Sequence, residues 1–90
     1  MKTVRVKVNA ETIQDGSPRK ACWCPVALAL EAATGFIWAV HSGIAERIMS
    51  IADREPANLP LEVVERIDSY DLTEVMDPFE FDFTYSGEAK

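Results

Sequence analysis

Hydrophobic and polar residues alternate most regularly near the two ends of the chain. Residues 3–8 alternate polar side chains with valines, and residues 79–85 alternate polar side chains with aromatic rings. The apolar positions of the two segments are Val4, Val6, Val8, Phe79, Phe81, Phe83 and Tyr85. A period of two residues is typical of a strand with one buried face. We therefore predict a strand near each end, the last one with an aromatic face.

Two longer segments have the spacing of helices. Residues 24–34 are apolar on nearly every side, with Pro25 at the favoured first helical position and Gly35 after the end. Residues 60–70 carry one apolar stripe, and residues 10–14 add a single expected helical turn. A helix that is apolar all round must be buried. We therefore expect residues 24–34 to cover the aromatic face of the last strand.

The middle of the chain leaves two alternatives open. Residues 36–40 are wholly apolar and predict an interior strand, followed by a turn at residues 41–43. Residues 44–52 have apolar positions at helical spacing, but they also alternate as a strand would. Residues 53–59 are expected to be a polar loop, and residues 71–78 a connection.

Taken together, the pattern predicts an α+β fold. We expect residues 1–90 to form one small domain, with residues 86–90 as a flexible tail. A mainly antiparallel sheet of three to four strands would combine with two helices in the order β-α-β-β-α-β. The side chains expected in the core or at its edge include Trp23, Leu28, Leu30, Trp38, Val64 and Ile67.

The charge of the chain is unevenly distributed. The net charge is −6, and twelve of the fifteen acidic side chains fall in residues 46–90. Eight acids recur there at short intervals: Glu62, Glu65, Asp68, Asp71, Glu74, Asp77, Glu80 and Asp82. Such an acidic strip would repel nucleic acid and anionic membranes and attract a protein with a basic surface. The same residues also fit an ordinary solvated surface. No apolar run has the roughly 20 residues that a membrane span needs.

Three side chains are candidates for metal or thiol chemistry. Cys22, Cys24 and His41 could hold zinc with one carboxylate, or Cys24 could be a nucleophile with His41 as its base. Structural zinc usually has two well-separated ligand pairs, and no orienting group accompanies the thiol. We therefore expect no enzyme, cofactor or metal site, and we interpret both cysteines as small buried apolar side chains. His41 is expected to be a turn residue with a solvent-facing ring.

Three segments together carry a family resemblance. They are Val4-x-Val6 leading to Ile13-x-x-Gly16; Cys24-Pro25-Val26-Ala27-Leu28-Ala29-Leu30; and Leu59-Pro60-x-Glu62-Val63 with Ile67, Tyr70-Asp71 and Pro78-Phe79-Glu80-Phe81. The chain resembles a family of small uncharacterised proteins of bacteriophages and prophages. The run that starts at Cys24 is the most specific part. The resemblance implies two strands in the middle segment, which favours a strand over residues 44–52. It supplies no catalytic residue.

The resemblance also implies a context for function. A phage protein of this kind would work in the cytoplasm of a bacterial host cell, and small acidic phage proteins are often inhibitors of host or defence proteins, including anti-CRISPR proteins. We therefore expect a non-catalytic binding protein that inhibits such a partner through its acidic surface. One alternative is a structural or accessory protein that dimerises or docks through a sheet edge. A second alternative is a small cysteine-based metal or thiol site.

Overall fold

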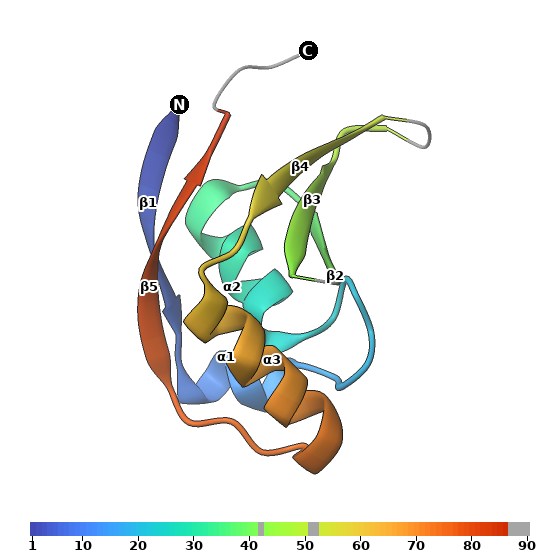
Figure 1. Ribbon diagram of the computed structural model, residues 1–90, viewed down its shortest axis with the longest axis vertical. Helices are drawn as coiled ribbons and strands as arrows, with labels where there is room; N and C mark the ends of the chain where they lie inside the picture. The colour runs from blue at the N-terminus through green and yellow to red at the C-terminus, as the bar shows by residue number, and fades with distance from the viewer. Residues whose placement is uncertain (42, 51–52, 87–90) are drawn as a thin grey trace.

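The two terminal strands pair with each other. Figure 1 shows the computed structural model, which describes residues 1–41, 43–50 and 53–86. β1 (Lys2–Val8) and β5 (Phe79–Tyr85) run antiparallel, and their register places Val6 opposite Phe81. The alternating valines of β1 therefore lie opposite alternating aromatic residues of β5. Both predicted strands and their shared apolar face are confirmed.

Three strands from the middle of the chain form a second antiparallel sheet. β2 (Trp38–His41), β3 (Ile44–Ile48) and β4 (Arg54–Asn58) pair in chain order. The α+β class is confirmed. The expectation of one continuous sheet is wrong, because the described part of the chain forms two sheets, one of two strands and one of three.

A helix and three aromatic rings join the two sheets. α2 (Pro25–Thr34) packs against both β1 and β2, and Figure 1 shows it in the space between the sheets. The ring of Trp38 lies edge-on against Phe83 and Tyr85 of β5, with ring centroids 5.1 and 5.6 Å apart. The sheets therefore meet mainly through side chains, which is why they remain separate hydrogen-bonded ladders.

The segment after β2 is extended. Residues 44–52, for which helix and strand were both open, contain β3, so the helical alternative is wrong for the described part; residues 51 and 52 lie outside it. Residues 53–59 contain β4, and the prediction of a loop there is also wrong. Its sequence, Arg-Glu-Pro-Ala-Asn, has little strand propensity. Pairing with β3 keeps this segment extended.

The outer edge of β4 contains a proline where no donor is needed. Leu59 N–H donates to the carbonyl of Gly43 at 3.4 Å, and antiparallel ladders bond at every second residue. Arg54, Pro56 and Asn58 therefore direct their backbone groups away from β3. Because proline has no N–H, Pro56 removes one donor from this free edge and makes it a poorer template for another strand.

The described chain has three helices, since the turn expected over residues 10–14 is the short helix α1 (Ala10–Asp15). Cys24 begins α2, because its sulfur accepts a hydrogen bond from Ala27 N–H at 3.3 Å. The helix predicted over residues 60–70 is α3 (Leu61–Thr73), which extends beyond the predicted end. None of the helices within the described ranges has the length and apolar character needed to cross a bilayer.

Burial follows one face of α2 rather than its whole circumference. Leu30 and Trp38 are buried as predicted, but Glu31 and the two alanines after it are exposed. Three other predicted core residues are only half-buried: Leu28, Val64 and Ile67. Trp23 is 60 % exposed, so its predicted core position is wrong. Sheets lie on only part of the surface of α2, and Trp23 and Leu28 border a shallow hollow beside α1.

We predict that Phe81→Ala lowers the free energy of unfolding by about 3–5 kcal/mol. Phe81 is 3 % exposed and packs against Phe79 and Phe83, so truncation leaves a cavity in the core. Urea unfolding measures the loss. Leu72→Ala is the control, because Leu72 is 86 % exposed and its truncation is expected to change stability by only about 0.5 kcal/mol. Equal effects of the two substitutions would contradict the aromatic core.

Candidate functional site

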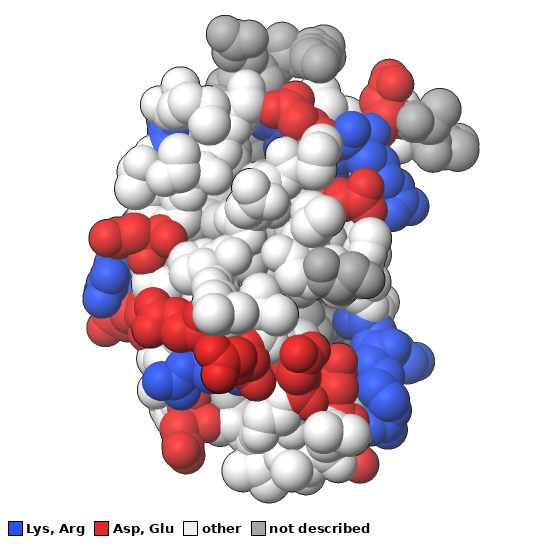
Figure 2. All heavy atoms as spheres, viewed as in Figure 1, with Lys and Arg blue, Asp and Glu red and all other residues white. Residues whose placement is uncertain are grey.

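The structure distributes the eight predicted acidic residues over three elements of the chain. Glu62, Glu65, Asp68 and Asp71 belong to α3, Glu74 and Asp77 follow it, and Glu80 and Asp82 belong to β5. All are exposed except Asp71, which is half-buried. Figure 2 shows acidic side chains across the face formed by α3 and β5, with basic side chains among them. The acids that are close together in the sequence therefore form a surface that basic side chains interrupt.

Arg5 neutralises part of the predicted strip. Its guanidinium bonds Glu80 and Asp82, each at 3.2 Å, across the β1–β5 ladder. These hydrogen bonds, that to Asp82 foremost, raise the pKa of Arg5 above its usual value. The two carboxylates therefore contribute less negative charge to the surface than the sequence alone indicates. The sequence does not reveal this contact, because Arg5 lies far from both acids along the chain.

The outward side of α3 keeps its acids unpaired. Glu62, Glu65 and Asp68 form no ion pair with any residue in the described ranges. Leu61 is 73 % exposed and Leu72 is 86 % exposed on the same helix. Residues 61, 65, 68 and 72 follow helical i, i+4, i+7 and i+11 spacing, which places them in one row. We call Leu61, Glu62, Glu65, Asp68 and Leu72 the α3 acidic face.

Arg66, the basic residue of α3, packs against an aromatic ring. The Arg66 guanidinium lies 4.5 Å from the centroid of the Phe79 ring, in a cation–π contact with β5. The long side chain thus helps to hold α3 against the first sheet. Its charge is also held close to β5.

The C-terminal end of α3 has two features that oppose helix stability. Glu74 follows the helix with φ of 60°, a left-handed conformation that glycine adopts more easily. The last turn has no basic residue, although the partial negative charge of a helix C-terminus favours one. Asp71 and Glu74 instead add negative charge there. Strained residues and unfavourable charges of this kind often mark functional surfaces.

Asp71 connects α3 to the loop before α2. Its carboxylate accepts the backbone N–H of Arg19 at 2.9 Å, while the Arg19 guanidinium donates to the backbone carbonyl of Asp71 at 2.7 Å. Arg19 also has a left-handed backbone, with φ of 60°. The two non-glycine residues with positive φ in the described chain, Arg19 and Glu74, therefore both lie beside the last turns of α3.

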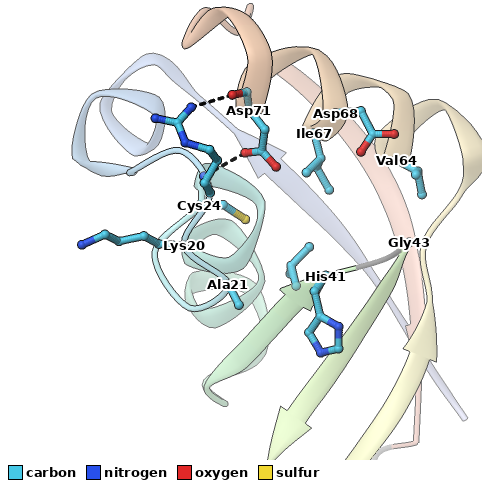
Figure 3. Close-up of a pocket in the computed structure, with 11 residues that line it drawn as sticks. Lys20, Ala21, Cys24, His41, Gly43, Val64, Ile67, Asp68 and Asp71 are labelled. Carbon is cyan, nitrogen blue, oxygen red and sulfur yellow. Dashed lines mark hydrogen bonds between the residues drawn. The ribbon is translucent and has the colours of Figure 1, made fainter.

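A cavity of about 220 Å³ opens beside this contact (Figure 3). It lies between α3, the loop before α2 and the end of β2. Apolar side chains contribute to its lining: Ala21, Cys24, Val40, Val64 and Ile67. Polar and charged side chains complete it: Arg19, Lys20, His41, Asp68 and Asp71. The sequence does not reveal this cavity, because its walls come from segments about 50 residues apart in the chain.

The candidate metal and thiol residues have different environments. Cys24 is buried and borders the cavity, whereas Cys22 is exposed, so the prediction that both cysteines are buried is wrong for Cys22. His41 is exposed as predicted, but it ends β2 rather than lying in a turn, and its Nε2 bonds Glu46. Burial raises the pKa of the Cys24 thiol. No group of three metal-ligating side chains occurs within the described ranges.

No family model matches the chain, and comparisons with curated proteins and with solved structures also give no match.

We predict that stability falls as the pH rises above the ordinary cysteine pKa of about 8.5. The raised pKa of Cys24 means that the unfolded chain releases its thiol proton first, so stability is complete below that pH and is lost up to the higher folded pKa. Urea unfolding across this range measures the effect. Cys24→Ser keeps a helix-capping oxygen and does not titrate there, so its pH dependence should be weaker. If the parent and Cys24→Ser lose stability identically with pH, Cys24 is not the cause of the loss.

We also predict that Glu74→Gly raises the free energy of unfolding by about 1 kcal/mol, because glycine relieves the left-handed strain. Thermal or urea unfolding gives the value. Glu74→Gln removes the charge and keeps the strain, so it should gain only a few tenths of a kcal/mol. If the glutamine variant matches the glycine variant, charge and not backbone strain is the cause.

Proposed function

We propose that this protein is a non-catalytic binding domain whose α3 acidic face docks on the basic surface of a partner protein. The observation that carries the proposal is the exposure of Leu61 and Leu72 in one row with Glu65 and Asp68. Single exposed leucines also occur on ordinary solvated surfaces, but these two lie in a row with carboxylates. Within an interface they can supply buried anchors, while the carboxylates steer the encounter and select a basic partner.

The strain and charge at the end of α3 support the same surface. Glu74 holds a backbone conformation that a glycine would make less costly, and its carboxylate opposes the helix dipole. A sequence shaped only by stability would favour glycine or a basic residue at this end. The strained backbone and the acidic charge at this end have a reason if the carboxylates of Asp71 and Glu74 contact a partner. Binding can then compensate for the lost stability.

The chemistry of the thiol supports a non-catalytic role. Cys24 caps α2 through its sulfur, and burial favours the protonated thiol over the nucleophilic thiolate. Cys24 is therefore better suited to a packing and capping role than to nucleophilic attack.

The proposed partner is a host or defence protein in a bacterial cytoplasm. This part of the proposal comes from the resemblance to a family of small uncharacterised phage and prophage proteins and from an analogy with small acidic phage proteins, which are often inhibitors of host or defence proteins. A partner that binds nucleic acid has a basic groove, and an acidic helix face can occupy such a groove in place of phosphates. Inhibition would then follow from simple occupancy.

Docking through a sheet edge has less support from the geometry. Pro56 removes a donor from the outer edge of β4, and the N–H of Val40 on the outer edge of β2 donates to the Ala21 carbonyl at 2.9 Å. Both features reduce the backbone groups available to a second chain. Docking through an edge would also be insensitive to salt, which gives a direct way to separate the two ideas.

We predict that Glu62→Gln/Glu65→Gln weakens capture of a basic partner from bacterial lysate, and that adding Leu61→Ala weakens it further. Parent capture should also decrease between about 0.01 and about 0.15 M salt, as the screening length falls from about 30 to about 8 Å. Quantitative mass spectrometry of the captured proteins measures both effects. Loss of two charges near the contact should reduce binding by about tenfold or more.

The matched control for this experiment is Glu11→Gln/Asp15→Asn, which removes the same charge from α1. It should retain the parent's partner and salt dependence. If both double variants capture the same proteins equally well, the α3 acidic face is only a solvated surface. Capture that is indifferent to salt would instead favour an apolar sheet edge.

A further inference from the structure

We propose that the cavity beside α3 accepts a lysine side chain of the partner protein. This inference rests on the proposed function, because it names the group that the acidic surface would anchor. The cavity lies at one border of the α3 acidic face, since Asp68 belongs to both. A side chain projecting from a basic partner that covers α3 would therefore reach the opening directly.

The cavity suits a long aliphatic stem. In Figure 3, Ile67 extends from α3 into the space above Ala21 and His41, Val64 lies above Gly43, and the Cys24 sulfur lies below Asp71. These side chains offer apolar contact to methylene groups. Because burial keeps Cys24 protonated, its sulfur adds no negative charge to the floor. A volume of about 220 Å³ exceeds what a single small ion would use.

The carboxylates suit the charged end of that stem. Asp71 uses one oxygen, Oδ1, to accept the Arg19 N–H, and within the described ranges no group donates to its other oxygen. Asp68 has no ion-pair partner within those ranges. Neither basic side chain of the lining forms an ion pair with Asp68 or Asp71 within the described ranges. Arg19 is held by the Asp71 carbonyl, and Figure 3 shows Lys20 directed away from the cavity.

The same geometry favours lysine over arginine. An arginine fork binds best to a carboxylate that offers both oxygens side by side. Asp71 has only one oxygen available, because Arg19 already occupies the other. An ammonium is a compact charge with three donors, so it can use the single available oxygen of Asp71. His41 also lines the cavity, but its Nε2 is engaged with Glu46.

The test is a titration of the intact protein with capped Gly-Lys-Gly, followed by backbone amide NMR. We expect shifts centred on Ala21, Gly43 and Val64, and much smaller shifts with capped peptides that carry norleucine, acetyl-lysine or arginine. Asp68→Asn and Asp71→Asn should each weaken binding by about tenfold. Asp71→Asn keeps an oxygen acceptor for Arg19, so the loop can stay in place. Ala21→Leu should block the cavity without changing charge.

Glu11→Gln is the matched control, because it removes one charge from α1, outside both the cavity and the α3 acidic face. It should bind the lysine peptide as the parent does. The inference is overturned if the lysine peptide causes no shifts at the cavity, if norleucine matches lysine, or if Asp68→Asn and Glu11→Gln behave alike. Any of these results would leave the proposed function intact provided that Glu62→Gln/Glu65→Gln still loses the partner. If Glu62→Gln/Glu65→Gln still captures the partner while the cavity binds the lysine peptide, only the proposed function is overturned.

Discussion

The edge-on packing of Trp38 against Phe83 and Tyr85 is the contact on which the rest of the structure depends. It joins the middle sheet to the terminal sheet across more than 40 residues of chain. The Trp38 indole N–H also donates to the Thr34 hydroxyl at 2.8 Å, which fixes the end of α2 on the same ring. One residue therefore orients both sheets and the helix between them. A small domain has few such contacts, so each carries a large share of its marginal stability.

That arrangement also brings together charges that are far apart in sequence. Basic residues of the first half meet acids of the second half: Arg5 bonds Glu80 and Asp82, and Arg19 holds Asp71. Folding therefore leaves a group of unpaired acids on α3 and just after it, although the acids of α1 and α2 also form no ion pair within the described ranges.

The same helix combines weak local stability with an exposed, chemically distinctive surface. Its C-terminal end carries acids where the dipole favours bases, and Glu74 has a left-handed backbone. The contact between Asp71 and Arg19 offsets part of this cost, because it fastens the helix end to the loop before α2. It also forms one wall of the cavity. The last turns of α3 therefore contribute both to the stability of the fold and to the proposed binding surface.

The sequence by itself determined the terminal strands, the main helices and the α+β class, because alternation at Val4 to Val8 and at Phe79 to Tyr85 and the apolar stripes are local signals. It could not determine β4 or the separation into two sheets, since Pro56 and its polar neighbours have no strand pattern and depend on pairing with β3. It located the acids but not their partners. Only the tertiary structure decided that Arg5 neutralises two of them and that Cys24 and Asp71 border one cavity, because those contacts join distant segments.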